Sequence, residues 1–278
     1  MRARFHLARL GHSSAAPILQ RSAVLYVPGL IMSRWKAAGI HFSVSIVLGI
    51  AIGAVLFGVW YPPPFFYAAS ADKLLLLLIG VDVVLGPVLT LIVFKSGKPG
   101  LRFDLVCIAV VQTLALAYGV SVMTRSRPVF LVAAVDRFLL VSANDLDDTD
   151  LAQGSKPEFR TRSWTGPRLV GVQLPIDVAN RNSLLFSGIA GKDVDRYPRY
   201  YVDYTTIAPQ FVAKARSVDA LAKLDFASRA RLEAAVRDTG KSMKDVVWVP
   251  MLARKATMVM LLDRATGTPL RAVAVNPQ

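Results

Sequence analysis

Three long apolar runs follow one another in the first half of this chain, and they constrain its fold more than any other feature. They cover residues 40–60, 74–94 and 105–123, and the only acidic or basic residue inside them, apart from His41, is Asp82. A helix of about 20 mostly apolar residues crosses the roughly 30 Å hydrocarbon core of a bilayer. The sequence therefore predicts three transmembrane helices in an α-helical membrane domain that covers residues 32–124.

Lys and Arg residues near the ends of these runs predict the orientation of the helices. Six of them precede the first run, and the loop between the second and third runs holds Lys95, Lys98 and Arg102. The loop between the first and second runs holds only Lys73, beside Asp72. Because such cations stay on the cytoplasmic side, we expect a cytoplasmic N-terminus and a periplasmic domain at residues 125–278. The protein would then lie in a bacterial inner membrane.

Residues 1–31 fit a cleaved signal peptide poorly. Pro17 and Pro28 interrupt their apolar stretch, and no clear small-residue cleavage site precedes the first run. Met32 begins the segment Met-Ser-Arg-Trp-Lys, which lies directly before the first apolar run and suits a translation start. We therefore expect translation from Met32, with residues 1–31 as a disordered N-terminal extension, although the sequence leaves a start at Met1 open.

The net charge of +14 invites a nucleic-acid function, but its distribution argues against one. Residues 1–123 hold 10 Lys and Arg against 3 Asp, and residues 124–278 hold 23 against 16 acids, so each half carries +7. Neither half shows a dense basic stripe with interleaved aromatic residues. We therefore expect no nucleic-acid partner.

Small and charged residues inside the runs predict helix contacts. Gly49 and Gly53 form a GxxxG pair, which lets another helix come close, and that helix belongs either to this chain or to a partner. A carboxylate in mid-membrane costs several kcal/mol unless it is paired or protonated. By depth, Gly53 and Gln112 or Thr113 lie level with Asp82. Asp82 therefore either bonds to such neighbours or meets a cationic or polar group on a partner helix.

Prolines predict two local features of this half. Gly86-Pro87 should kink the second helix near residues 83–87, because proline removes a helical hydrogen bond. Residues 61–64, Tyr-Pro-Pro-Pro, should form stiff polyproline II between the first two helices.

In residues 125–278 the spacing of the apolar residues changes several times between a helical and a strand period. This predicts an α+β domain with helices set between groups of strands. Polar residues 142–163 should form a loop. Apolar, β-branched patterns predict one long or two short strands at 129–141, and further strands at 168–174, 246–252, 257–262 and 270–275. Helical patterns cover 177–186, 209–224 and 226–238.

Four tyrosines gather in one segment: Tyr197, Tyr200, Tyr201 and Tyr204. Tyrosine combines a large apolar area with a polar tip, so the segment is a candidate docking surface. The same residues serve equally well in a domain core, which is the commoner use.

No catalytic or cofactor-binding motif emerges. The three histidines, His6, His12 and His41, lie in or before the first run, so the second half has none for a triad or a zinc site. There is no phosphate-binding glycine loop, HExxH or CxxC, and the only cysteine is Cys107. We expect a protein that is not an enzyme and binds neither cofactor nor metal.

Several of these segments, in this order, resemble the type IV pilin accessory proteins of the TfpX and TfpZ kind. The resemblance covers the chain from Met32 and is strongest between Trp35 and Leu146. The pieces that carry it are WKAAGIHFS at 35–43, WYPPP at 60–64, GVD at 80–82 with LGP at 85–87, LRFDL at 101–105, RPVF at 127–130 and DRF at 136–138.

The resemblance implies an inner-membrane accessory, chaperone-like protein that binds the major type IV pilin and promotes its stability, assembly or display. The expected partners are the pilin's transmembrane helix, its periplasmic head, other pilus assembly components and the membrane. Gly49, Gly53 and Asp82 are the candidate residues for the helix, and the four tyrosines for the head. A membrane-anchored periplasmic sensor or ligand-binding module is the alternative, which co-purification with pilin would distinguish.

Overall fold

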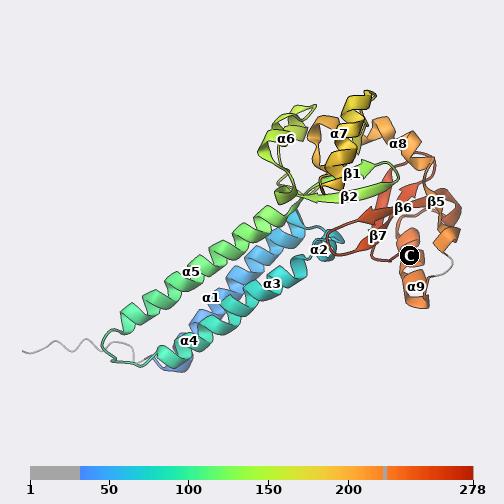
Figure 1. The fold of residues 1–278 in the computed structure, drawn as a ribbon. Coiled ribbons are helices and arrows are strands. Elements are labelled where there is room, and N and C mark those ends of the chain that lie inside the picture. Colours follow the sequence, from blue (N-terminus) through green and yellow to red (C-terminus); the bar gives the residue numbers. More distant parts are fainter. Residues whose placement is uncertain (1–31, 222–223, 278) are drawn as a thin grey trace, which may run out of the picture. The chain divides into compact units, whose positions relative to one another are not determined.

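The computed structural model describes residues 32–221 and 224–277, and the expected N-terminal extension lies outside this range. From Ser33 onward the chain forms one compact unit. Within it, three long apolar helices precede a mixed α/β sheet domain (Figure 1).

The three long helices match the three apolar runs and extend beyond them. The first joins α1 (Arg34–Val55) to a π-helical segment, Leu56–Trp60. The second joins α3 (Ala71–Ile79), a π-helical segment and α4 (Gly86–Val93), and the third is α5 (Leu101–Ser126). At 27, 23 and 26 residues, all three are long and apolar enough to cross a membrane.

The second helix is irregular where Gly86-Pro87 predicts an interruption. Its π-helical segment, Gly80–Leu85, ends directly before α4, and Pro87 lies in the first turn of α4. Pro87 has no N–H, and its ring crowds the carbonyl of residue 83, so the regular ladder cannot continue through this turn. The wider π turn carries Asp82.

The 61–70 loop, which joins the first and second long helices, differs from the prediction. The Pro63-Pro64 peptide is cis, and Pro64 has φ −94° and ψ 7°, far from the polyproline II region. A short helix, α2 (Phe65–Ala68), follows at once. The expectation of a stiff polyproline spacer is therefore wrong: the loop turns back, and Ala68 joins the core of the sheet domain.

The domain is built on one mixed sheet whose strands follow the order β4-β3-β1-β2-β6-β7-β8, with β5 also paired to β6. Pairs β1–β3 and β2–β6 are parallel, and the other pairs are antiparallel. The strands are β1 (Pro128–Ala134), β2 (Arg137–Ser142), β3 (Arg168–Val172), β4 (Tyr201–Val202), β5 (Arg216–Ser217), β6 (Val246–Leu252), β7 (Thr257–Asp263) and β8 (Pro269–Val273).

Alternate residues of the strands serve different cores. In β1, Leu131 and Ala133 face the core that contains α8 (Tyr204–Val212) and Ala68 of the 61–70 loop. Phe130 and Val132 face the opposite core, which contains Leu184 of α7 (Val178–Ile189). A third core packs α9 (Phe226–Asp238) against β6, β7 and β8. The 61–70 loop and α7 therefore lie on opposite faces of the sheet.

Two predicted elements of the domain differ from the structure. The helix predicted at 209–224 is wrong in its bounds: Pro209 lies inside α8, which ends at Val212, and residues 216–217 pair with Trp248 and Val247 of β6. Here strand pairing outweighs a helical pattern that proline already weakens. The predicted 142–163 loop contains short helices, including α6 (Asp148–Ala152).

Side chains at the ends of the long helices bind the domain to them. Lys255, in the turn between β6 and β7, donates from Nζ to Asp72 at 2.9 Å and from its backbone N–H to Ala68 O at 3.1 Å. Arg127, 4% exposed, donates to Ser163 O and, at the end of α5, to Thr124 O. The carbonyl-rich helix end offsets its buried charge. The domain is thus fixed to the long helices by several independent contacts.

Candidate functional site

A recess of about 320 Å³ lies between the second and third long helices. Leu74, Leu78 and Val81 of the second helix line one wall, and Leu116 and Val122 of α5 line the other. Nearly all of the lining is apolar. The carboxylate of Asp82 is the only charged group among the lining residues.

Asp82 is 8% exposed, and the described residues give its side chain no hydrogen bond and no ion pair. The π turn between Gly80 and Leu85 places it in the recess. The depth estimate from the sequence is one turn off. The amide of Gln112 lies against Gly86, whereas Leu116 and Gly119 share the recess with Asp82.

His41, Ser45, Gly49 and Gly53 follow one another at intervals of four and form a stripe on the first helix, which packs largely against the second. His41 Nδ1 lies 2.6 Å from Thr90 Oγ1, Ser45 is buried, and a Cβ on Gly49 would lie 3.9 Å from Val83 Cγ2. A Cβ on Gly53 would meet nothing within 4 Å. The stripe thus faces this chain's own second helix at Gly49 and leaves space at Gly53.

Of the glycines in the long helices, two that the sequence analysis did not assign to helix packing lie closest to a neighbouring helix. A Cβ on Gly86 would overlap the Gln112 amide, and one on Gly119 would lie 2.8 Å from Leu78 Cδ1. Both glycines join the second helix to the third. Small residues inside apolar helices commonly mark such contacts, so a search for them beyond the GxxxG pair would have found both.

The third helix offers most of its surface to its surroundings. Of α5, all of which the structure describes, only Met123 is buried. On the same helix, the Oε1 and Nε2 atoms of Gln112 are buried without a hydrogen bond from the described residues. An unsatisfied amide in an apolar setting is costly. This helix pair therefore has unmet polar capacity at Gln112 and at Asp82.

The structure separates the four tyrosines into two pairs. Tyr201 and Tyr204 lie in the core; their hydroxyls donate to Asp195 O and Gly267 O, and burial raises the pKa of Tyr204 to about 12. Their rings cannot contact a partner of the folded domain. Tyr197 and Tyr200 are half-buried, and the Arg199 guanidinium lies 5.0 and 4.8 Å from their ring centroids. Only this second pair can contribute to a docking surface.

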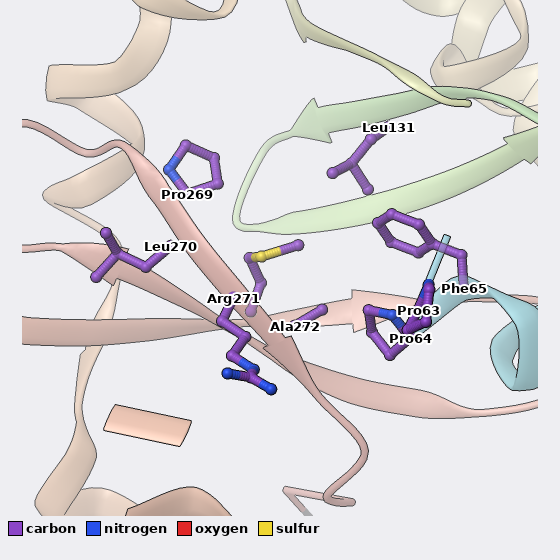
Figure 2. A pocket seen from close by; sticks show the side chains of 9 residues that line it. Pro63, Pro64, Phe65, Leu131, Pro269, Leu270, Arg271 and Ala272 are labelled. Atoms are coloured by element: carbon purple, nitrogen blue, oxygen red, sulfur yellow. The ribbon is translucent and has the colours of Figure 1, made fainter. Parts of the chain in front are cut away.

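A second recess, of about 410 Å³, opens between the 61–70 loop and the sheet. In Figure 2, Pro63, Pro64 and Phe65 stand on one side of it and strand β8 runs along the other. Leu131 and Ala272 contribute apolar surface from the sheet. This recess lies beside the loop that leads into the second long helix.

Among residues 32–221 and 224–277, no group of three or more metal-ligating side chains comes together. The recess beside Asp82 is thus an apolar groove with one carboxylate in its wall, next to a domain packed on the same helices.

These features define a membrane-associated protein with three long apolar helices and an α/β domain packed on their ends. A sequence model of the fimbrial assembly protein FimB family matches residues 30–69, the first long helix and most of the 61–70 loop. Relatives come from Dichelobacter nodosus. The chain is 27% identical to the fimbrial assembly protein of serogroup E1 over 233 residues, which is 82% of this chain and 90% of the relative.

The corresponding protein of serogroup I is 26% identical over the same length. That of serogroups C1 and C2 is 32% identical over 120 residues, 42% of this chain and 92% of the relative. The chain belongs to the fimbrial assembly protein family, which confirms the type IV pilus accessory family predicted from its sequence. No solved structure matches it.

Proposed function

We propose that this chain promotes pilus assembly by holding the major type IV pilin in the membrane through the groove between its second and third long helices. The observation that supports the proposal is Asp82, a carboxylate in an apolar groove whose side chain makes no hydrogen bond or ion pair with the described residues. The names of the relatives support the biological context, since they are fimbrial assembly proteins.

The groove suits a helical client. Its walls are apolar, so a client helix can replace lipid there without loss of hydrophobic burial. A carboxylate in hydrocarbon is costly unless a polar or cationic group meets it. A client helix with such a group at the depth of Asp82 gains binding free energy beyond that of packing alone. Helices without such a group bind less favourably.

The domain would engage the part of the pilin outside the membrane. Because Lys255 and Arg127 fix the domain to the helix ends, its surfaces stand at a set distance from the groove. Tyr197 and Tyr200 offer half-buried aromatic rings, and the recess beside Phe65 offers apolar surface next to the helix ends. With the N-terminus in the cytoplasm and the domain in the periplasm, the groove and the domain surfaces would both meet a pilin anchored in the inner membrane.

The test replaces Asp82 in the native organism and measures surface pili and total pilin. Asp82→Asn keeps size and hydrogen-bonding atoms but removes the charge, and Asp82→Leu removes both. Asp104→Asn is the matched control, because Asp104 lies in the first turn of the third helix, away from the groove, and its carboxylate is 2.6 Å from Lys98 Nζ. We expect several-fold fewer pili in both Asp82 variants and normal pili in the control.

Pilin levels distinguish the step affected. Loss of pili with stable pilin places the action at assembly or display, and loss of pilin itself places it at stability. Full piliation by Asp82→Leu, at wild-type levels of this protein, would exclude Asp82 from client binding.

A further inference from the structure

Helix α7 turns its most apolar face to solvent. Leu184 is the only buried residue of this fully described helix. Val178, Leu185, Phe186 and Ile189 are between 66% and 84% exposed. Four large apolar side chains on three turns are more than isolated surface residues, so this face is shaped to be covered.

Three of these residues, together with Asn182, have the spacing with which one helix packs against another. Val178, Asn182, Leu185 and Ile189 follow one another at intervals of four, three and four. With 3.6 residues per turn they lie within an arc of about 60°, on the side of the helix away from Leu184. This spacing matches the a/d seam of a two-helix coiled coil, with Val178 and Leu185 at d and Asn182 and Ile189 at a.

Lipid is a poor candidate for the covering partner. Through Leu184, α7 packs on the sheet face opposite to the one that Ala68 of the 61–70 loop covers. That loop leads into the apolar helices, so the seam lies on the other side of the sheet from them. A covering partner must therefore reach it outside the bilayer.

The seam is complementary to itself. An Asn amide both donates and accepts hydrogen bonds, so two Asn182 side chains can pair when two α7 helices lie parallel and in register. Asn at an a position, with Ile at a and Leu at d, favours a parallel two-stranded pair. In this register, Arg181 of one helix adjoins Phe186 of the other, five positions on, which allows a cation–π contact.

We propose that α7 is a dimerisation helix that pairs in parallel with α7 of a second copy of this chain. Three turns span only about 18 Å, so the contact is weak between molecules in solution. Two copies confined to one membrane meet at a far higher effective concentration. The dimer is thus a property of the membrane-bound protein.

Site-specific disulfide formation tests the proposal on the full chain in native membranes, in a Cys107→Ser background. Asn182→Cys places a thiol in the seam. Asn180→Cys is the matched control, since it carries the same change two residues away on the same helix, outside the seam. A disulfide needs Cα atoms within about 7 Å, so mild oxidation should give about tenfold more dimer of twice 30.2 kDa from Asn182→Cys.

A second variant separates dimerisation from misfolding. Leu185→Asp, combined with Asn182→Cys, should abolish the cross-link while the thermal transition of the protein stays unchanged, because Leu185 is exposed in the monomer. The cross-link should persist in a strain without pilin, which distinguishes it from the client groove. Equal cross-linking of both cysteine variants, or adducts only with another protein, would overturn the proposal.

Discussion

The hydroxyl of Tyr61 donates a 2.7 Å hydrogen bond to the backbone carbonyl of Met123. Tyr61 directly follows the first long helix, and Met123 lies in the last turn of the third. Both are fully or nearly fully buried, together with Leu56, Phe66, Ala69 and Ala71. Burial also raises the pKa of Tyr61 above its usual range, so the hydroxyl stays protonated and donates at all physiological pH values.

Replacement of this hydroxyl should destabilise the protein. Tyr61→Phe leaves a buried carbonyl without its donor, which costs about 1–3 kcal/mol. Tyr67→Phe is the control, because Tyr67 is 66% exposed and its hydroxyl makes no hydrogen bond with the described residues. Thermal unfolding of both variants in detergent should show a lower Tm for the first and no change for the second. Equal Tm values would mean that the bond contributes nothing.

Gly119 sets the distance between the second and third helices. Gly119→Leu should drive α5 away from Leu78, at a cost of about 1–3 kcal/mol for overpacking. Gly58→Leu serves as the control, since a Cβ at Gly58 meets nothing within 4 Å. Thermal unfolding should show a lower Tm for Gly119→Leu only. A comparable decrease in Tm for both variants would show that the loss of a glycine, and not the contact with Leu78, destabilises the protein.

Asp263 gives the domain a predictable pH dependence. Its hydrogen bonds from Lys241 and from the backbone N–H groups of Thr266 and Ala265 lower its pKa to about 2, from an ordinary 3.8. A pKa that is lower in the folded state means stability that is present above pH 3.8 and lost as the pH falls toward 2. Lys241→Met should therefore lower Tm at pH 7 and matter progressively less in that acid window.

Lys244→Met is the control for this charge change, because Lys244 is exposed and its ammonium forms no ion pair with the described residues. A Tm difference between wild type and Lys241→Met that stays constant from pH 7 to pH 2 would contradict the role of Asp263.

Patterns that depend on neighbours in the sequence predicted their elements well. The strands at 246–252 and 257–263 and the helix at 226–238 lie within a residue of their predicted bounds. The two short strands of residues 129–141 also form. Periodicity and turn residues are local properties, so one sequence is enough to find them.

Features that depend on contacts between residues far apart in the sequence were not predicted. The 61–70 loop folds back because Ala68 completes a core made by strands more than 60 residues away. Residues 216–217 are drawn into pairing with β6. At the candidate site, the position of Asp82 in the second helix follows from the sequence, but its groove depends on how α5 packs against Gly86 and how Leu78 packs against Gly119. The distance between two packed helices depends on contacts between residues far apart in the chain, so local sequence patterns do not predict it.

The central claim, that the groove beside Asp82 holds pilin, is tested most directly by photo-crosslinking in native membranes. A photoreactive amino acid at Tyr118 lies at the groove, 74% exposed, and one at Val111 lies on the same helix, 64% exposed, outside the recesses described above. We expect a pilin adduct from position 118 that is lost with Asp82→Leu, and little or none from position 111. No adduct from position 118, or equal adducts from both positions, would contradict it.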